Sequence, residues 1–179
     1  MPEIEIRQVV PADIEDLSLF EHGYHSSYVW QMNMNLALES MEIKFIRIRL
    51  PRQVFVPYPR NRDQIFNDLN NAEAVLAAIL DQRPVGYIKV MAEGSNHIAR
   101  VSDLVVSAAL RRQGIASGLL LTVMDLISRR GFSALMLEIQ SKNDPAISMA
   151  AKLGFKYCGF RDQYFPNNDL ALFFSRFSH

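Results

Sequence analysis

Apolar and polar residues alternate at the start of the chain. Residues 3–10 alternate well enough to predict a strand. The next segment, "PADIEDLSLFEH", places a proline and several acids at the beginning of an apolar periodic run, which is typical of a helix start. The chain is therefore expected to open with a strand followed by a short helix.

A long alternating region follows. Between residues 28 and 38 the even positions are aromatic or apolar and the odd positions are largely polar, which is the period of a half-buried strand. A second run, residues 41–50, changes phase between Phe45 and Ile46 and predicts a β-bulge there. Together the two runs predict an antiparallel hairpin. Three prolines in residues 50–63 favour an extended loop after it.

Short apolar runs at residues 72–82 and 85–94 predict two central strands, although the first run alone is also compatible with a helix. Residues 97–109 read as the next strand. Apolar residues then recur every fourth position and predict a long helix that ends before Gly131: Ile115, Leu119, Val123 and Ile127.

The last part of the chain predicts a strand at 133–140, a short helix from Asn143 to Leu153, and two strands around "PNND" at 166–169. The order of these elements predicts an α/β fold with a mixed, mostly antiparallel sheet flanked by helices. No shift in composition divides the chain, so we expect a single domain over residues 1–179.

Composition narrows the class of partner. The chain has 19 basic and 19 acidic residues, so no global charge favours nucleic acid or an anionic membrane, and we expect neither as a partner. No apolar stretch is long enough to span a bilayer, and the N-terminus does not resemble a signal peptide. The lone cysteine, Cys158, fits a reducing compartment, and we expect a cytoplasmic protein. His22 and His25 lack further ligands nearby, so no metal is expected.

The segment "LRRQGIASGLLLTVMDLI" holds the strongest chemical signal. A helix N-terminus offers free N–H groups and a partial positive charge, which together bind anions. Gly114 allows close approach of a ligand, Ser117 adds a hydroxyl donor, and Arg111 and Arg112 add positive charge. A phosphate or pyrophosphate is the expected anion. Taken alone, the glycines could equally serve only close packing of the helix on the sheet.

Two ordered motifs resemble the GNAT superfamily of N-acetyltransferases. Arg111-x-x-Gly114-x-Ala116 lies between an apolar strand and a long helix, and "LEIQSKNDPAISMAAKLGF" follows with Asn143 and a closing Gly-Phe pair. The resemblance covers about residues 75–177, whereas the first 70 residues match only in their β then α opening. The arm at 24–60 and the tail "DLALFFSRF" more loosely resemble the streptothricin acetyltransferase type.

The resemblance implies a site for acetyl-CoA, the co-substrate. Its pyrophosphate would lie on the backbone amides of residues 112–117: Arg112, Gln113, Gly114, Ile115, Ala116 and Ser117. Main-chain groups of Leu104 and Val106 would hold the pantetheine arm like an added strand, and Asn143 would reach the thiol end. Asn143 also fits a helix N-cap, with Asp144 and Pro145 after it, and the two roles are compatible.

The resemblance also implies direct transfer of the acetyl group to an amine, which needs a proton acceptor and benefits from a proton donor. Asp103 is the first candidate for the base and Glu138 the second. The family usually carries a tyrosine where this chain has Ala150 and often a glutamate where it has Ser102. Tyr157 and Tyr164, shortly downstream, are the candidate substitutes for the donor. Each of these four residues could instead be an ordinary packed or ion-paired side chain.

The sequence thus predicts an acetyl-CoA-dependent N-acetyltransferase acting on a primary amine of a small molecule or a protein N-terminus. The alternative is a catalytically silent acyl-CoA-binding module, which the departures at Ser102 and Ala150 favour. The arm at 24–60 is expected to contribute the acceptor side. Its stripe of Trp30, Met32 and Met34 is compatible with ordinary core, a substrate channel or a homodimer contact.

Overall fold

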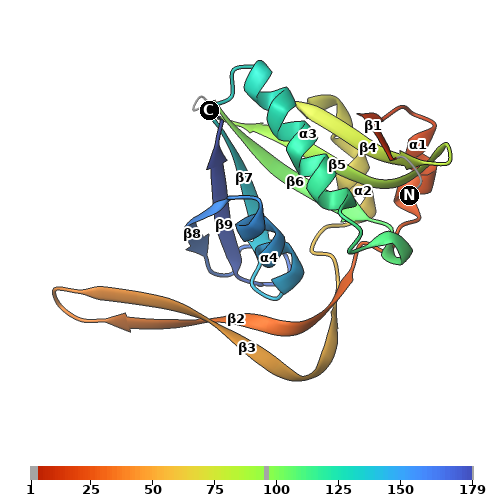
Figure 1. The fold of residues 1–179 in the computed structure, drawn as a ribbon. Coiled ribbons are helices and arrows are strands. Elements are labelled where there is room, and N and C mark those ends of the chain that lie inside the picture. Colours follow the sequence, from red (N-terminus) through yellow and green to blue (C-terminus); the bar gives the residue numbers. More distant parts are fainter. Residues whose placement is uncertain (1–3, 95–96, 179) are drawn as a thin grey trace.

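The computed structural model describes residues 4–94 and 97–178, and its centre is a seven-stranded sheet in the order β1-β4-β5-β6-β7-β9-β8 (Figure 1). Neighbouring strands are antiparallel except β6 and β7, which are parallel. The elements are β1 (Glu5–Gln8), α1 (Asp13–Ser18), β2 (Tyr24–Leu36), β3 (Met41–Val56), α2 (Arg62–Asn67), β4 (Ala74–Leu80), β5 (Arg83–Glu93), β6 (Ile98–Val106), α3 (Ile115–Arg129), β7 (Ala134–Gln140), α4 (Asp144–Lys152), β8 (Lys156–Arg161) and β9 (Ala171–Phe177), with single 3-10 turns at Leu69–Asn71 and Ala108–Leu110.

Helices cover both faces of the sheet, which confirms the predicted mixed α/β fold. The apolar stripe of α3 packs on one face, where Leu119, Val123 and Ile127 are fully buried among side chains of the central strands. α1 and α2 pack on the other face, where Leu17 and Ile65 enclose Tyr87 of β5. Because successive strand residues point to opposite faces, β5 contributes to both cores. No helix in the described ranges is long and apolar enough to cross a membrane.

The predicted hairpin is present as a two-stranded arm, β2 and β3, that projects away from the main sheet (Figure 1). The middle of β2 is attached to the start of α4 and the residues before it: the Trp30 amide donates to the Ser141 carbonyl at 2.9 Å, and the Trp30 indole donates to Asp144 at 3.1 Å. Arg47 forms two further hydrogen bonds to Asp144, at 2.6 and 2.8 Å. Toward its tip the arm is exposed on both faces.

Two predictions about the arm are wrong. The register is continuous across Phe45 and Ile46, and the irregularity lies instead at Ser26–Tyr28. The phase change did not require a bulge, because the outer arm has no buried face to impose a single alternation. Residues 51–56, predicted as loop, continue β3. Pro51 lies opposite the register shift between Ser26 and Tyr28, so its missing N–H removes no hydrogen bond between the two strands.

Helix α2 is not among the elements expected from the sequence. Its start carries a capping box: the Asn61 side chain accepts from the Asp63 amide at 3.2 Å, and the Gln64 side chain accepts from the Asn61 amide at 3.4 Å. The signature Asn-x-x-Gln was present in the sequence. The first strand, predicted over 3–10, is observed at Glu5–Gln8, and residue 3 lies outside the described residues.

Candidate functional site

A cleft opens where the two parallel strands diverge. β6 and β7 pair only between Ile98–Val101 and Ala134–Leu137, and beyond these residues their facing edges separate. The cleft between them has a volume of about 650 Å³ and is lined by residues 101–106 of β6 and 137–140 of β7. At one end it reaches the turn before α3 and the start of α4. The unpaired edges supply backbone N–H and C=O groups to whatever lies between them.

The turn before α3, where the sequence predicts an anion site, leaves open space above Gly114. Gly114 caps the helix with φ of 86°, in the left-handed region, and a Cβ built there would meet nothing within 4 Å. Arg112 also has positive φ, at 68°. The first amides of the helix, from Ile115 onward, have no partner within the helix. Except for the exposed Gln113, all of residues 112–117 line the cleft: Arg112, Gly114, Ile115, Ala116 and Ser117.

Arg111 supports this turn from behind. Its guanidinium donates to the carbonyls of Val106 and Gly23, both at 2.9 Å, and to the carbonyl of Glu21. Burial lowers its pKa from the usual arginine value. The side chain therefore ties the loop before β2 to the end of β6, and its five donors serve mainly the protein backbone rather than an open anion site.

The remaining predicted contact residues also lie along the cleft. Leu104 and Val106 line it from the part of β6 that has no β7 partner. Asn143 lines it from the start of α4 and is the N-cap, its side chain accepting from the Ala146 amide at 3.2 Å. This confirms the predicted capping role. The second side-chain group of Asn143, its NH₂, is a donor that the cap does not use.

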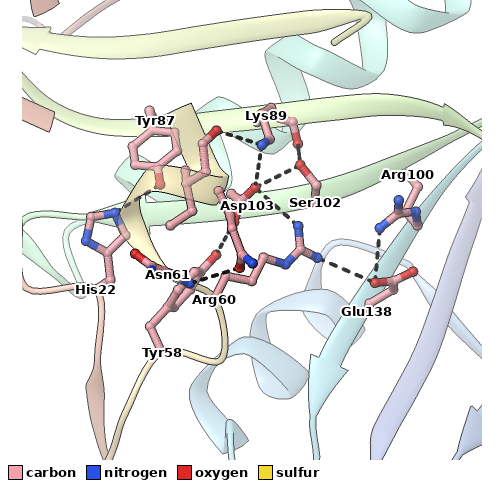
Figure 2. A network of polar contacts seen from close by, with 12 residues as sticks. His22, Tyr58, Arg60, Asn61, Tyr87, Lys89, Arg100, Ser102, Asp103 and Glu138 are labelled. Carbon is pink, nitrogen blue, oxygen red and sulfur yellow. Dashed lines mark hydrogen bonds and ion pairs between the residues drawn. The ribbon is translucent and has the colours of Figure 1, made fainter. Parts of the chain in front are cut away.

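Asp103 lies at the other end of the cleft, at the centre of a buried polar network (Figure 2). Its residue is 1% exposed. One carboxylate oxygen of Asp103 accepts a hydrogen bond from the Tyr58 hydroxyl at 2.6 Å. The other accepts from the Ser102 hydroxyl at 2.9 Å and lies 3.3 Å from the Lys89 ammonium group. The buried Lys89 also donates to the Ile65 carbonyl at 2.8 Å. Asp103 is thus held by closely packed donors from three separate segments.

Glu138 faces this network from β7. Arg100 lies 3.2 Å from one of its oxygens, and the Tyr164 hydroxyl donates to the other at 2.7 Å. Arg60 bridges the two strands, 3.4 Å from Asp103 and 3.8 Å from Glu138 (Figure 2). The two predicted base candidates are therefore brought to the same end of the cleft, and both carry ion-pair partners.

The tyrosines predicted as donors lie apart from each other. Tyr164 contacts Glu138, and burial together with this carboxylate raises its pKa to about 12. Tyr157 lies on the edge strand β8, half exposed beside Phe45 and Phe174. Neither is among the residues lining the cleft. Ala150, at the family's tyrosine position, is fully buried.

Two other tyrosines line the cleft, although neither is among the site residues predicted from the sequence. Tyr24 donates to the Gln140 side chain at 2.9 Å, and Gln140 in turn donates to Asp169 at 2.9 Å. Burial raises the pKa of Tyr24 and, with the neighbouring Asp103, that of Tyr58. Both phenols thus stay protonated hydrogen-bond donors at neutral pH. Long-range contacts place four residues around the cleft, and no local sequence motif identifies them: Tyr24, Tyr58, Arg60 and Lys89.

His22 and His25 both line the cleft and also contact neighbouring side chains or backbone. The His22 ring nitrogens lie 2.8 Å from the Phe20 carbonyl and 3.0 Å from the Tyr87 hydroxyl. His25 stacks edge-on against Phe55. No group of three metal-ligating side chains occurs among the residues that the structure describes.

A mixed sheet with diverging parallel strands beside a glycine-capped helix start defines the class of coenzyme A-dependent N-acyltransferases. The model of the acetyltransferase (GNAT) family matches residues 36–155, and the chain belongs to this family. Among solved structures it superposes on a nourseothricin acetyltransferase with a TM-score of 0.80 and 20% identity, covering 97% of this chain and 98% of that one. It also superposes on a Bacillus anthracis protein assigned as a streptothricin acetyltransferase and solved with acetyl coenzyme A, with a TM-score of 0.79, 17% identity and coverage of 98% and 100%.

Two sequence relatives have names that give them different acceptors. The ribosomal protein bS18-alanine N-acetyltransferase of Escherichia coli is 32% identical over 71 residues, which are 40% of this chain and 48% of the relative. The chain thus spans about half the length of this relative. A streptothricin acetyltransferase of Escherichia coli is 29% identical over 126 residues, 67% of this chain and 72% of the relative. The predicted family is confirmed by these matches and by the family model.

Proposed function

We propose that the protein is an acetyl-CoA-dependent N-acetyltransferase that moves the acetyl group by direct transfer to a primary amine of a small molecule or a peptide N-terminus. The observation that carries this proposal is the continuous cleft from the Gly114 turn to the pair Asp103 and Glu138. One end suits a phosphate and the other holds groups able to handle a proton. Membership of the family supports the same activity.

Acetyl-CoA fits the cleft on the chain's own features. The amides of residues 112–117 would hold the pyrophosphate, since the space over Gly114 is open. The unpaired edge at Leu104 and Val106 would hold the pantetheine arm, and the Asn143 amide group would reach its far end. When bound, acetyl-CoA supplies an activated acetyl group. The residues that line the cleft would orient it between β6 and β7.

Asp103 and Glu138 are the proposed proton acceptors for the attacking amine. Asp103 is enclosed by Tyr58, Ser102 and Lys89. Glu138 also lines the cleft and is buried beside Arg60 and Arg100. In the proposal Tyr164 positions Glu138 through its hydroxyl. Tyr157, which is remote from these carboxylates, is the weaker of the two predicted donors.

A second candidate function is a silent acyl-CoA-binding module. Two observations favour it: Ala150 is fully buried where relatives carry a tyrosine, and the Ser102 hydroxyl, where relatives often carry a glutamate, donates to Asp103. The cofactor-binding half of the cleft would be the same in either case, so turnover alone separates the two functions.

We also propose a cytoplasmic homodimer that uses the arm. The lone cysteine supports a reducing compartment. Apolar side chains near the arm tip are exposed, which is unusual for a surface without a partner: Met34, Leu36, Leu38 and Met41. A two-fold contact between identical arms would bury the same surface on both copies.

The test is acetyl-CoA-dependent thiol release against a panel of amines, with binding of acetyl-CoA measured in parallel. Gly114→Asp places a negative charge in the turn, and Gly114→Asn is its matched neutral control, since both residues tolerate positive φ. We expect Gly114→Asp to weaken acetyl-CoA binding at least 10-fold more than Gly114→Asn. Saturable binding without turnover on any amine would favour the silent module. Equal binding by the two folded variants would contradict the anion turn.

A further inference from the structure

Arg60 lines the cleft and lies between Asp103 and Glu138 (Figure 2). It belongs to the segment between β3 and α2, and its guanidinium reaches a carboxylate on each of the diverging strands. Its contacts, 3.4 Å to Asp103 and 3.8 Å to Glu138, are longer than the 2.7–2.9 Å of a strong charge-assisted hydrogen bond. Its side chain is 25% exposed, and Arg60 is among the residues that line the cleft.

Both carboxylates have closer partners than Arg60. Asp103 accepts from Tyr58 at 2.6 Å and has the buried Lys89 as its cation, at 3.3 Å. Glu138 accepts from Tyr164 at 2.7 Å and has Arg100 as its cation, at 3.2 Å. Each negative charge is therefore matched before Arg60 is counted. Arg60 is the surplus cation at this end of the cleft.

The remaining lining does not offset this charge. Among the described lining residues the only carboxylates are Asp103 and Glu138, and both are paired. Of the other arginines of the lining, Arg111 donates to three backbone carbonyls and Arg112 belongs to the turn before α3. An acceptor with several ammonium groups would thus meet Arg60 and no unpaired carboxylate. An anionic group on the acceptor would meet a half-engaged guanidinium, whose planar donors match a carboxylate.

We propose that the acceptor is a small amine that also carries a carboxylate, of the amino acid class, and that Arg60 binds this carboxylate. The inference rests on the proposed acetyltransferase function and specifies its acceptor. In the reaction the amine nitrogen forms a bond to the acetyl carbon and the carbon–sulfur bond breaks. The proton lost from the amine balances the proton gained by the departing thiolate. Arg60 takes no part in that proton transfer and acts on specificity.

The experiment uses pairs of acceptors that differ only in the anionic group: amino acids and their carboxamides, and lysine with its decarboxylated diamine. Turnover of acetyl-CoA is measured for each pair with the native chain. We expect the carboxylate member to have a kcat/KM at least 10-fold higher. In Arg60→Ala this ratio falls at least 10-fold through KM of the carboxylate member, whereas Arg60→Lys keeps part of it because the charge remains.

Arg129→Ala is the matched control, since this arginine is exposed on α3 and pairs only with its helix neighbour Asp125 in the described structure. It should leave the preference unchanged. Preference of the native chain for diamines or carboxamides, or an equal loss for both members in Arg60→Ala, would overturn the inference while the acetyltransferase function stands. Absence of turnover on every amine would overturn both. Circular dichroism of each variant separates these outcomes from loss of folding.

Discussion

Lys89 and Asp103 form an ion pair deep between the sheet and α2. Lys89 is 3% exposed and Asp103 is 1% exposed. Removing one partner of such a pair leaves a buried charge without compensation, which costs more than the pair itself contributes. The energetic role of Asp103 therefore has to be separated from any role as a base.

We expect Asp103→Asn to lower the free energy of unfolding by about 3–5 kcal/mol, because Lys89 is left uncompensated. Adding Lys89→Met should restore most of the loss, and chemical denaturation measures both changes. A base would show itself separately, as a missing acidic limb in the pH profile of kcat/KM of the refolded double variant. A free energy of unfolding of Asp103→Asn equal to that of the native chain would contradict a stabilising role for the Lys89–Asp103 pair.

Tyr164 predicts a dependence of stability on alkaline pH. Its pKa is raised to about 12, by burial first and then by Glu138, from a reference value of 10.0. Between these values the unfolded chain loses a proton that the folded chain keeps, so the free energy of unfolding falls as pH rises. We expect Tyr164→Phe to reduce this fall, because phenylalanine has no proton to lose. Chemical denaturation across the alkaline range measures the free energy of unfolding of both chains. An identical slope in the variant would contradict the shift.

At the scale of elements, the attachment of the arm to α4 depends on one carboxylate. Asp144 accepts from Arg47 and from the Trp30 indole, and it lies in the first turn of α4, where a negative charge is favoured. The hydrogen bonds from Arg47 lower the pKa of Asp144 from its usual value. The stabilisation is thus fully present at neutral pH and is lost as pH falls through the lowered pKa.

We expect Asp144→Asn to lower the free energy of unfolding by about 2 kcal/mol at neutral pH, with a smaller difference in acid, where the native carboxylate is itself protonated. Intrinsic fluorescence of Trp30, the single tryptophan of the chain, reports the local release of the arm. Glu42→Gln is the control, because its pair with Lys44 is exposed and contributes little. Equal effects of the two substitutions would argue against this attachment.

Neighbouring residues in the turn before α3 have different structural roles. Gly114 leaves the space above the helix start open, whereas Arg111 binds three backbone carbonyls and fixes the turn to the loop before β2. Adjacent positions of one motif therefore have different roles. The family motif marks the element, and the contacts of each side chain define what it does there.

At the scale of the whole molecule, the outer part of the arm is exposed in the described chain. Leu38 and Met41 at its tip are 105% and 68% exposed. We expect the native chain to form a dimer in sedimentation equilibrium and Leu38→Glu with Met41→Glu to be monomeric at the same concentration, with unchanged stability. Leu121→Glu, at an exposed position on α3, is the control. A native chain that is monomeric throughout would contradict the proposed dimer.

The sequence by itself determined the elements with strong local signals. The four-residue period fixed the buried face of α3, and Asn143 with Pro145 fixed the start of α4. The glycine turn and its family were readable for the same reason, since spacing within one turn is a property of neighbouring residues. The bulge at Phe45 failed because alternation specifies register only where one face is buried.

The tertiary structure alone decided the acceptor end of the cleft. Arg60 follows β3, Asp103 lies on β6 and Glu138 lies on β7, and the three meet only in the folded chain. Lys89 joins them because β5 pairs with β6 with a shift in register beside it. Side-chain partners at such sequence distances leave no periodic trace, since they depend on strand order and register. Asp103 and Glu138 could be predicted as candidate bases from the sequence. Only the tertiary structure shows that both form ion pairs.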